Sequence, residues 1–104
     1  MDERKLSDTE IAAAGAELGA DWRVSGGILR RELEFYNFMS AIRFVNQVAE
    51  LAEAADHHPD MHIYYKRLVI ELTTHKLKAL SDKDFTLAHK IEAAFAEASA
   101  NKAQ

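Results

Sequence analysis

No cysteine occurs among the 104 residues of the chain, which excludes disulfide bonds, thiolate metal ligands and a cysteine nucleophile. The first residues are charged and polar, so they do not resemble the apolar core of a secretory signal. No apolar run approaches the ~20 residues that a membrane-spanning helix requires. We therefore expect a cytoplasmic protein that does not insert into a membrane.

An excess of positive charge is also absent. Thirteen Lys and Arg residues stand against 17 Asp and Glu residues, and the formal net charge is −4. Binding to the phosphates of a nucleic acid requires the opposite balance, so no direct nucleic acid contact is expected. The hydrophobic fraction of 48% and the charged fraction of 29% are close to those of globular proteins. Residues 1–104 are therefore expected to form a single domain.

Local signals in the first third of the chain predict one helix and a pair of strands. Ser7 and Glu10 have the spacing of a capping box, and Gly19 provides a stop for the helix that follows. Alternating apolar residues predict strands at 22–24 and 28–36. Two consecutive glycines between them suit a hairpin turn, because each can adopt a positive φ.

The middle of the chain changes to a helical period. A helix is expected over about residues 38–56, and Pro59 requires it to end at or before His57, since proline disfavours helical geometry at the preceding residue. The residues expected on its apolar face are Phe38, Ile42, Val45, Ala49 and Ala52, with Val48 at the flank.

The last third predicts two more strands and a closing helix. The strands are expected near 62–66 and then through Thr74, and the Ser81–Asp84 capping pattern starts a helix that runs to about Ala98. The order is α-β-β-α-β-β-α. Strands that arrive in hairpin pairs favour an α+β fold, with a four-stranded antiparallel sheet and three helices packed on one face.

Three of the five histidines lie close to the only proline, and this cluster has three possible interpretations: a helix end, a metal site or an acid–base site. Imidazolium near the last carbonyls of a helix is mildly stabilising, which explains one histidine but not two neighbours. A metal site would use His57, His58, His62 and His75. Adjacent residues in an extended chain point apart, and no recognised metal-binding spacing is present, so no metal site is expected.

The third reading is acid–base chemistry. Histidine can give and take a proton near neutral pH, but a catalytic site needs such groups to converge from different elements. His75 at a strand end and the two histidines at a helix end could meet at one edge of the sheet. Glu53 and Asp84 each have a plainer explanation, as a solvated helical charge and as a capping residue.

The motifs around these residues resemble those of the pterin-4a-carbinolamine dehydratase family. The matching segments are AExxxHHPD at 52–60, Tyr65, LTTH at 72–75, LSxxD at 80–84 and LAxxI at 87–91. The resemblance implies a fold with the order derived above. It also implies assembly into homodimers or homotetramers through sheet edges and helices.

The resemblance further implies a reaction, the removal of water from 4a-hydroxytetrahydropterin to give quinonoid dihydropterin. This step recycles the pterin after aromatic amino acid hydroxylation, so an aromatic amino acid hydroxylase is an implied partner. The pterin is the substrate, and neither a cofactor nor a metal is implied. One general acid and one general base are sufficient for such a dehydration.

The resemblance also assigns roles to individual residues. His58 and His75 would be the proton-transfer pair, and His57 would hold the substrate and support catalysis. Glu53 and Asp84 would orient these imidazoles, as a carboxylate fixes the tautomer of a histidine. The residues implied to bind the substrate are Asp56, His57, His58, Thr73, Thr74 and His75.

The chain departs from the family pattern at two places. Lys78 and Ala79 stand where many members have a glycine pair, which would cost ~1–2 kcal/mol at each position that needs a positive φ. Met61 stands where an aromatic residue is common, and an effect on the pocket wall is expected there.

Two non-catalytic functions remain open from the sequence. The chain could bind a pterin without turning it over, or it could be a protein-interaction module. Some family members act as dimerisation cofactors of a homeodomain transcription factor. Such a role would need an exposed apolar helix face, for which Phe38, Phe44 and Leu51 are the candidates.

Overall fold

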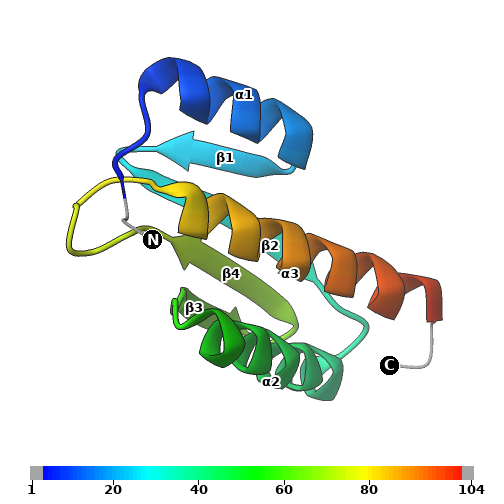
Figure 1. Ribbon diagram of the computed structural model, residues 1–104. Coiled ribbons are helices and arrows are strands. Elements are labelled where there is room, and N and C mark those ends of the chain that lie inside the picture. The colour runs from blue at the N-terminus through cyan, green and yellow to red at the C-terminus, as the bar shows by residue number, and fades with distance from the viewer. Residues whose placement is uncertain (1–3, 102–104) are drawn as a thin grey trace.

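Seven elements follow one another in a computed structural model that describes residues 4–101 (Figure 1). Their order confirms the predicted α-β-β-α-β-β-α arrangement. They are α1 (Asp8–Leu18), β1 (Trp22–Ser25), β2 (Ile28–Glu34), α2 (Phe38–Ala55), β3 (Asp60–Tyr64), β4 (Arg67–Leu72) and α3 (Asp82–Asn101).

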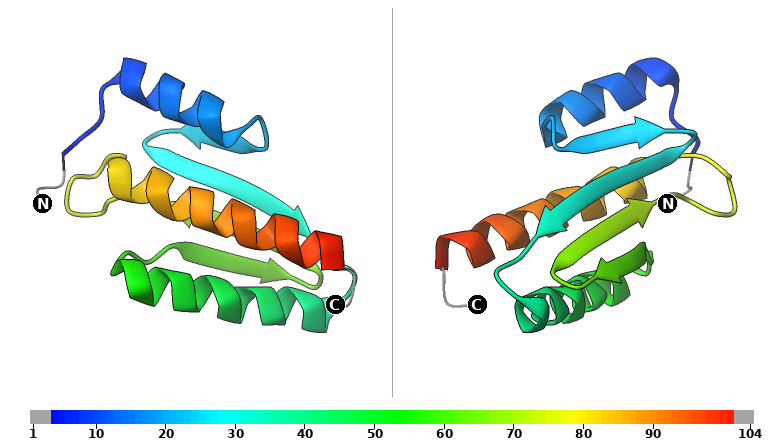
Figure 2. Two further views of the ribbon diagram at one scale, coloured as in Figure 1. Left: turned by 45° about the vertical axis from the view of Figure 1, so that its right-hand side comes forward. Right: turned by 180° about the vertical axis from the view of Figure 1, so that it is seen from behind.

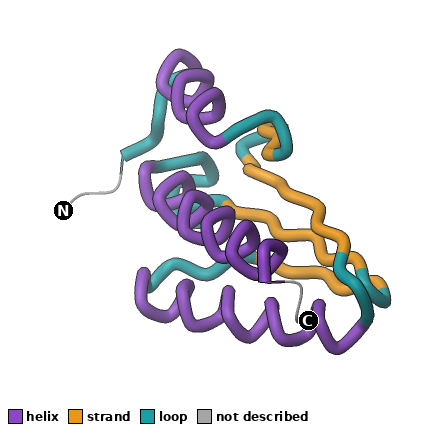
Figure 3. Tube along the Cα trace, turned by 90° about the vertical axis from the view of Figure 1, so that its right-hand side faces the viewer, coloured by secondary structure: helices purple, strands orange, loops and turns teal. Residues whose placement is uncertain are grey.

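The four strands form one antiparallel sheet in the order β1-β2-β4-β3. All three helices lie on the same side of it, as Figures 2 and 3 show, so the predicted α+β fold class is confirmed. Within residues 4–101, no helix combines the length and the apolar character needed to cross a bilayer.

The local signals act as predicted at the start of the chain. The Ser7 hydroxyl accepts a hydrogen bond from the Glu10 backbone N–H, and the Glu10 carboxylate accepts one from the Ser7 N–H. Gly19 ends α1 with a φ of 115°. Gly26 and Gly27 both have positive φ, so the β1–β2 hairpin closes through a two-residue turn that favours glycine.

The apolar face predicted for α2 is right at Val48 and Ala52, which are buried, and wrong at Phe38 and Ala49. Phe44 and Val48 are almost fully buried, whereas Phe38 is 45% exposed and Ala49 is also exposed. The helix is apolar on more than one side, so its periodicity alone does not choose between faces. Packing of the Phe44 ring against Phe35 and Phe95 decides which face turns inward. Phe44 therefore does not belong to an exposed interaction surface.

The third and fourth strands begin and end earlier than predicted. The turn between β3 and β4 falls at Tyr65 and Lys66, and Tyr65 adopts a φ of 59°. β4 ends at Leu72, after which Thr74 pairs with Ala79 in an isolated bridge. The segment after β4 is therefore a closed loop rather than a continuing strand.

Candidate active site

The C-terminal end of α2 carries two of the predicted site histidines. Asp56 adopts a left-handed conformation with a φ of 52°, which aspartate tolerates better than most residues. Its N–H donates to the Glu53 carbonyl at 3.2 Å, and the His57 N–H donates to the Ala52 carbonyl at 3.1 Å. These two bonds form a Schellman motif, which turns the chain sharply and brings His57 and His58 back beside the helix end.

The loop after β4 carries the third histidine and is closed by its own hydrogen bonds. The Thr74 N–H donates to the Ala79 carbonyl at 3.0 Å, and the Thr73 hydroxyl donates to the Gly27 carbonyl at 2.8 Å. The loop and the ends of α2 and β4 lie at the same end of the molecule, where α3 begins (Figure 1). His75 is thereby held on a tethered loop facing the α2 terminus.

These segments enclose an open cleft of about 240 Å³. Every residue implied to bind the substrate lines it, and one further residue does so that the sequence did not suggest. The lining residues are Asp56, His57, His58, Thr73, Thr74, His75 and Lys76. The three histidines therefore converge on one space, while their roles in catalysis stay a prediction.

Asp84, in the first turn of α3, lies behind the cleft and is completely buried. One carboxylate oxygen is 2.5 Å from His57 Nε2. The other accepts hydrogen bonds from the Thr74 hydroxyl at 2.8 Å and from the Ser81 N–H at 3.0 Å. Asp84 therefore contributes to the start of the helix and also contacts a cleft histidine.

Glu53 contacts the neighbouring histidine at the surface. Its carboxylate is 2.6 Å from His58 Nε2, and the side chains of His58 and Glu53 are 57% and 78% exposed. An exposed pair of this kind is worth ~0–1 kcal/mol, so it orients the imidazole without adding much stability.

The remaining histidines lie away from the cleft. His62 is 3.4 Å from a Glu71 oxygen on the exposed side of β3 and β4, and His89 is exposed on α3. Within the described part of the chain, no three His, Asp or Glu side chains are grouped as metal ligands would be.

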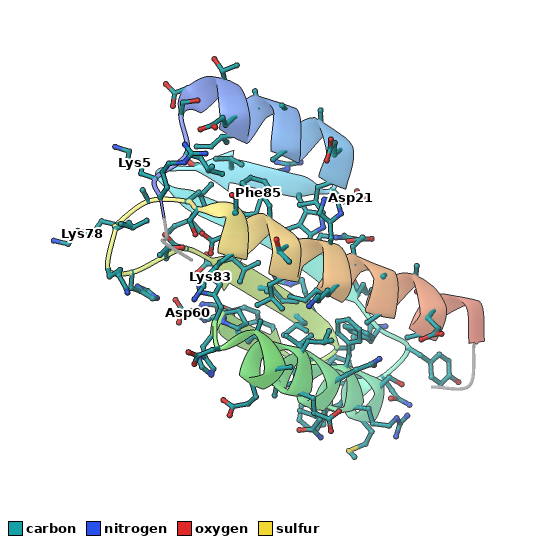
Figure 4. All side chains as sticks on the ribbon, viewed as in Figure 1. Lys5, Asp21, Asp60, Lys78, Lys83 and Phe85 are labelled. Carbon is teal, nitrogen blue, oxygen red and sulfur yellow. The ribbon has the colours of Figure 1, made fainter. Side chains whose placement is uncertain are left out.

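The two departures from the family pattern have different structural outcomes. Lys78 adopts a φ of 53°, whereas Ala79 has no positive φ, so only one of the two positions takes the left-handed geometry. The Lys78 side chain extends away from the fold at the outer edge of the loop (Figure 4). Met61 packs partly buried against the core and does not line the cleft.

Lys76 is the cleft residue that sequence reasoning missed. It follows the LTTH segment directly, but it carries none of the acid–base character that directed attention to His75. A signal was nonetheless available, because a tight loop after a strand brings the residues that follow a site histidine to the same rim.

The fold and the histidine-lined cleft define a class, the pterin dehydratase-like α+β domains. A crystal structure of a transcriptional coactivator/pterin dehydratase from Brucella melitensis superposes with a TM-score of 0.80 and 30% identity. The match covers 86% of this chain and 97% of that one. The family model for pterin 4 alpha carbinolamine dehydratase matches residues 4–94. The chain belongs to the pterin-4a-carbinolamine dehydratase family.

Similar curated proteins come from distant sources. A protein of a Picosynechococcus species is 45% identical over 84 residues, covering 81% of this chain and 90% of its own length. One from Metallosphaera sedula is 43% identical over 88 residues, covering 85% of this chain and 91% of its own length. Both carry the name "Putative pterin-4-alpha-carbinolamine dehydratase".

A pterin dehydratase-like RuBisCO assembly factor of the alpha-carboxysome is also similar in structure. Its TM-score is 0.60 and its identity is 19%, over 73% of this chain and 90% of that one. At this identity the likeness shows the shared fold alone.

Proposed function

We propose that this chain dehydrates a 4a-hydroxytetrahydropterin to the quinonoid dihydropterin by histidine acid–base catalysis. The observation that carries the proposal is the convergence of His57, His58 and His75, from two separate segments, on one cleft. Membership of the dehydratase family supports the choice of a pterin as the substrate.

The reaction breaks one bond and forms another without a change in redox state. A general acid protonates the hydroxyl on C4a, the C–O bond breaks, and water leaves. A ring nitrogen gives its proton to a general base as the new C=N bond forms, so one proton enters and one leaves. Each such transfer typically contributes ~10²–10⁴-fold to the rate.

His58 and His75 are proposed as the proton-transfer pair, because both are exposed and both line the cleft. His57 is proposed to hold the substrate, since its buried contact with Asp84 fixes the ring. We further propose that the chain acts as a homodimer or homotetramer, in the same cycle as an aromatic amino acid hydroxylase.

The test is the dehydration of freshly generated 4a-hydroxytetrahydropterin. His58→Ala is expected to abolish the acceleration over buffer and to leave the circular dichroism spectrum unchanged. His62→Ala is the matched control, because His62 is an exposed histidine outside the cleft. Turnover by the unaltered chain that is no faster than buffer would refute the proposed function.

A second candidate function is protein interaction, and exposed side chains at the start of α2 favour it. Tyr36, Phe38 and Met39 are 79%, 45% and 54% exposed, at the end of α2 far from the cleft. Size-exclusion chromatography with light scattering would test it. A stable tetramer that buries these side chains would remove them as a partner surface, whereas a monomer would keep them available.

A further inference from the structure

Two hydroxyl groups, one of them from the cleft residue Thr74, form a series of hydrogen bonds that ends on Asp84. The Ser81 and Thr74 hydroxyl oxygens are 2.6 Å apart, and the Thr74 hydroxyl donates to Asp84 Oδ2 at 2.8 Å. All three residues are buried, at 1%, 3% and 0% exposure for Ser81, Thr74 and Asp84. Water therefore has little access to these groups, and their partners must come from the protein.

The direction of these hydrogen bonds follows from the number of protons that each hydroxyl group can donate. A hydroxyl has one proton to donate, and Thr74 gives its proton to Asp84. The short contact between the hydroxyls then requires Ser81 to donate to Thr74. A carboxylate only accepts, which suits the donors around Asp84, and hydrogen bonds in such a chain strengthen one another.

The series of hydrogen bonds continues from Asp84 to His57. Asp84 Oδ1 is 2.5 Å from His57 Nε2, so this nitrogen carries a proton that is directed at the carboxylate. In neutral imidazole the other nitrogen, Nδ1, is then the acceptor that remains for another partner. If the Asp84 carboxylate rotated, the proton would no longer be fixed on His57 Nε2. The Thr74 hydroxyl and the Ser81 N–H hold the carboxylate against this rotation.

The backbone explains how the hydroxyls meet. Thr74 pairs with Ala79 in the isolated bridge that closes the loop, and Ser81 follows two residues later at the start of α3. The loop that carries His75 into the cleft thus also places the hydroxyls that orient His57 through Asp84.

We propose that Thr74 and Ser81 are positioning residues, whose hydroxyls hold Asp84 in the orientation that presents His57 to the substrate. This inference rests on the proposed function for its catalytic consequence. The Thr74 hydroxyl then donates its hydrogen bond to Asp84 and not to the pterin.

The first experiment replaces Thr74 by valine, which keeps the branched shape and removes the hydroxyl. Thr74→Val is expected to lower kcat/KM on the order of 10–100-fold, as is typical when the partner behind a metal-ligating histidine is lost, because His57 would no longer be held in the orientation that receives the substrate. Thr74→Ser restores a hydroxyl and is the matched comparison, expected to recover most of the kcat/KM that Thr74→Val loses. An unchanged kcat/KM in folded Thr74→Val would overturn the proposal, because the hydroxyl would then have no part in presenting His57.

A second readout does not depend on activity. The proton on His57 Nε2 is expected to give a downfield NMR signal in the substrate-free protein, which shifts or broadens in Thr74→Val and is preserved in Thr74→Ser. An unchanged signal in folded Thr74→Val overturns the positioning role. If the unaltered chain shows no dehydration, the proposed function fails, but this signal still tests the positioning role of Thr74. The two proposals can therefore be refuted independently.

Ser81→Ala keeps the inference testable if Thr74→Val does not fold. It removes the first donor of the chain and leaves Thr74 and Asp84 in place. A smaller change in the same direction, in both kcat/KM and the His57 signal, is expected, and Ser81→Thr is its hydroxyl-bearing control. No change in either quantity in Ser81→Ala would contradict the proposal.

Discussion

Two histidine–carboxylate pairs at the end of α2 have almost the same length and opposite surroundings. His57 and Asp84 meet at 2.5 Å in the interior, and His58 and Glu53 meet at 2.6 Å at the surface. Breaking a buried pair leaves a charge or polar group without a partner, whereas water replaces the partner in an exposed pair. Distance alone therefore does not tell what a pair does. The buried pair is suited to fixing a ring, and the exposed pair is suited to a ring that exchanges protons.

The largest expected effect comes from breaking the buried pair. Asp84→Asn keeps the volume but places an amide N–H₂ among groups that already donate, so it is expected to lower the free energy of unfolding by about 3 kcal/mol. Glu53→Gln, its exposed counterpart, is expected to change this free energy by less than about 0.5 kcal/mol. Urea denaturation followed by circular dichroism measures both. Equal effects of the two variants would mean that burial does not distinguish the pairs.

A second prediction separates catalysis from stability at the exposed side of the cleft. His75→Gln is expected to reduce kcat on the order of 100-fold or more, because it removes one of the two proposed proton-transfer groups. The midpoint of thermal unfolding should hardly change, since His75 is exposed. His57→Gln should lower both quantities, because His57 is buried against Asp84. The comparison of pairs would fail if His75→Gln destabilised the protein as much as His57→Gln.

A third carboxylate, Glu92 on α3, lies between these extremes of burial. Partial burial alone would raise the pKa of Glu92, but hydrogen bonds from Arg31 and Trp22 and the charge of Arg31 together hold it below the usual value of 4.5. A lowered folded pKa adds stability that is present above pH 4.5 and is lost as the pH falls below it. Glu92→Gln removes this contribution. The difference in unfolding free energy between the two proteins should therefore shrink as the pH is lowered through this range, and a constant difference would contradict the shift.

The smallest effect is expected at the outer edge of the site loop. Lys78 holds a φ of 53°, a geometry that costs a residue with a side chain ~1–2 kcal/mol. Lys78→Gly is expected to stabilise the protein by up to ~1 kcal/mol, because the greater freedom of glycine in the unfolded chain offsets part of the gain. Lys76→Gly, in the same loop but without a positive φ, should destabilise it, and chemical denaturation distinguishes the two.

Sequence reasoning predicted those features that depend on neighbouring residues. The Ser7–Glu10 capping box, the Gly26–Gly27 turn and the stop before His57 are each specified by a few adjacent side chains. The face of α2 was predicted only in part, because the inward position of Phe44 depends on contacts with Phe35 and Phe95 rather than on its own segment.

The candidate site shows the same division between local and distant information. Glu53 and His58 are five residues apart, and the left-handed turn at Asp56 lies between them, so their contact is made within one local segment. His57 and Asp84 are 27 residues apart, and nothing in the local pattern of either segment requires them to meet. The family resemblance implied that Asp84 orients a site imidazole, but it did not say which one, and it did not supply the Ser81–Thr74 hydroxyl contact or the position of Lys76 in the cleft.

The hydrogen bond from Thr73 to the Gly27 carbonyl makes the β1–β2 hairpin a support for a site to which it contributes no side chain. A side chain at position 27 would need a φ of +78°, and its Cβ would lie 3.6 Å from the Lys78 carbonyl oxygen. Insertions in the glycine hairpin are consequently expected to disturb the loop that carries His75, although the hairpin itself lies outside the cleft. Substitutions in the Gly26–Gly27 hairpin would therefore modulate this protein without altering its histidines.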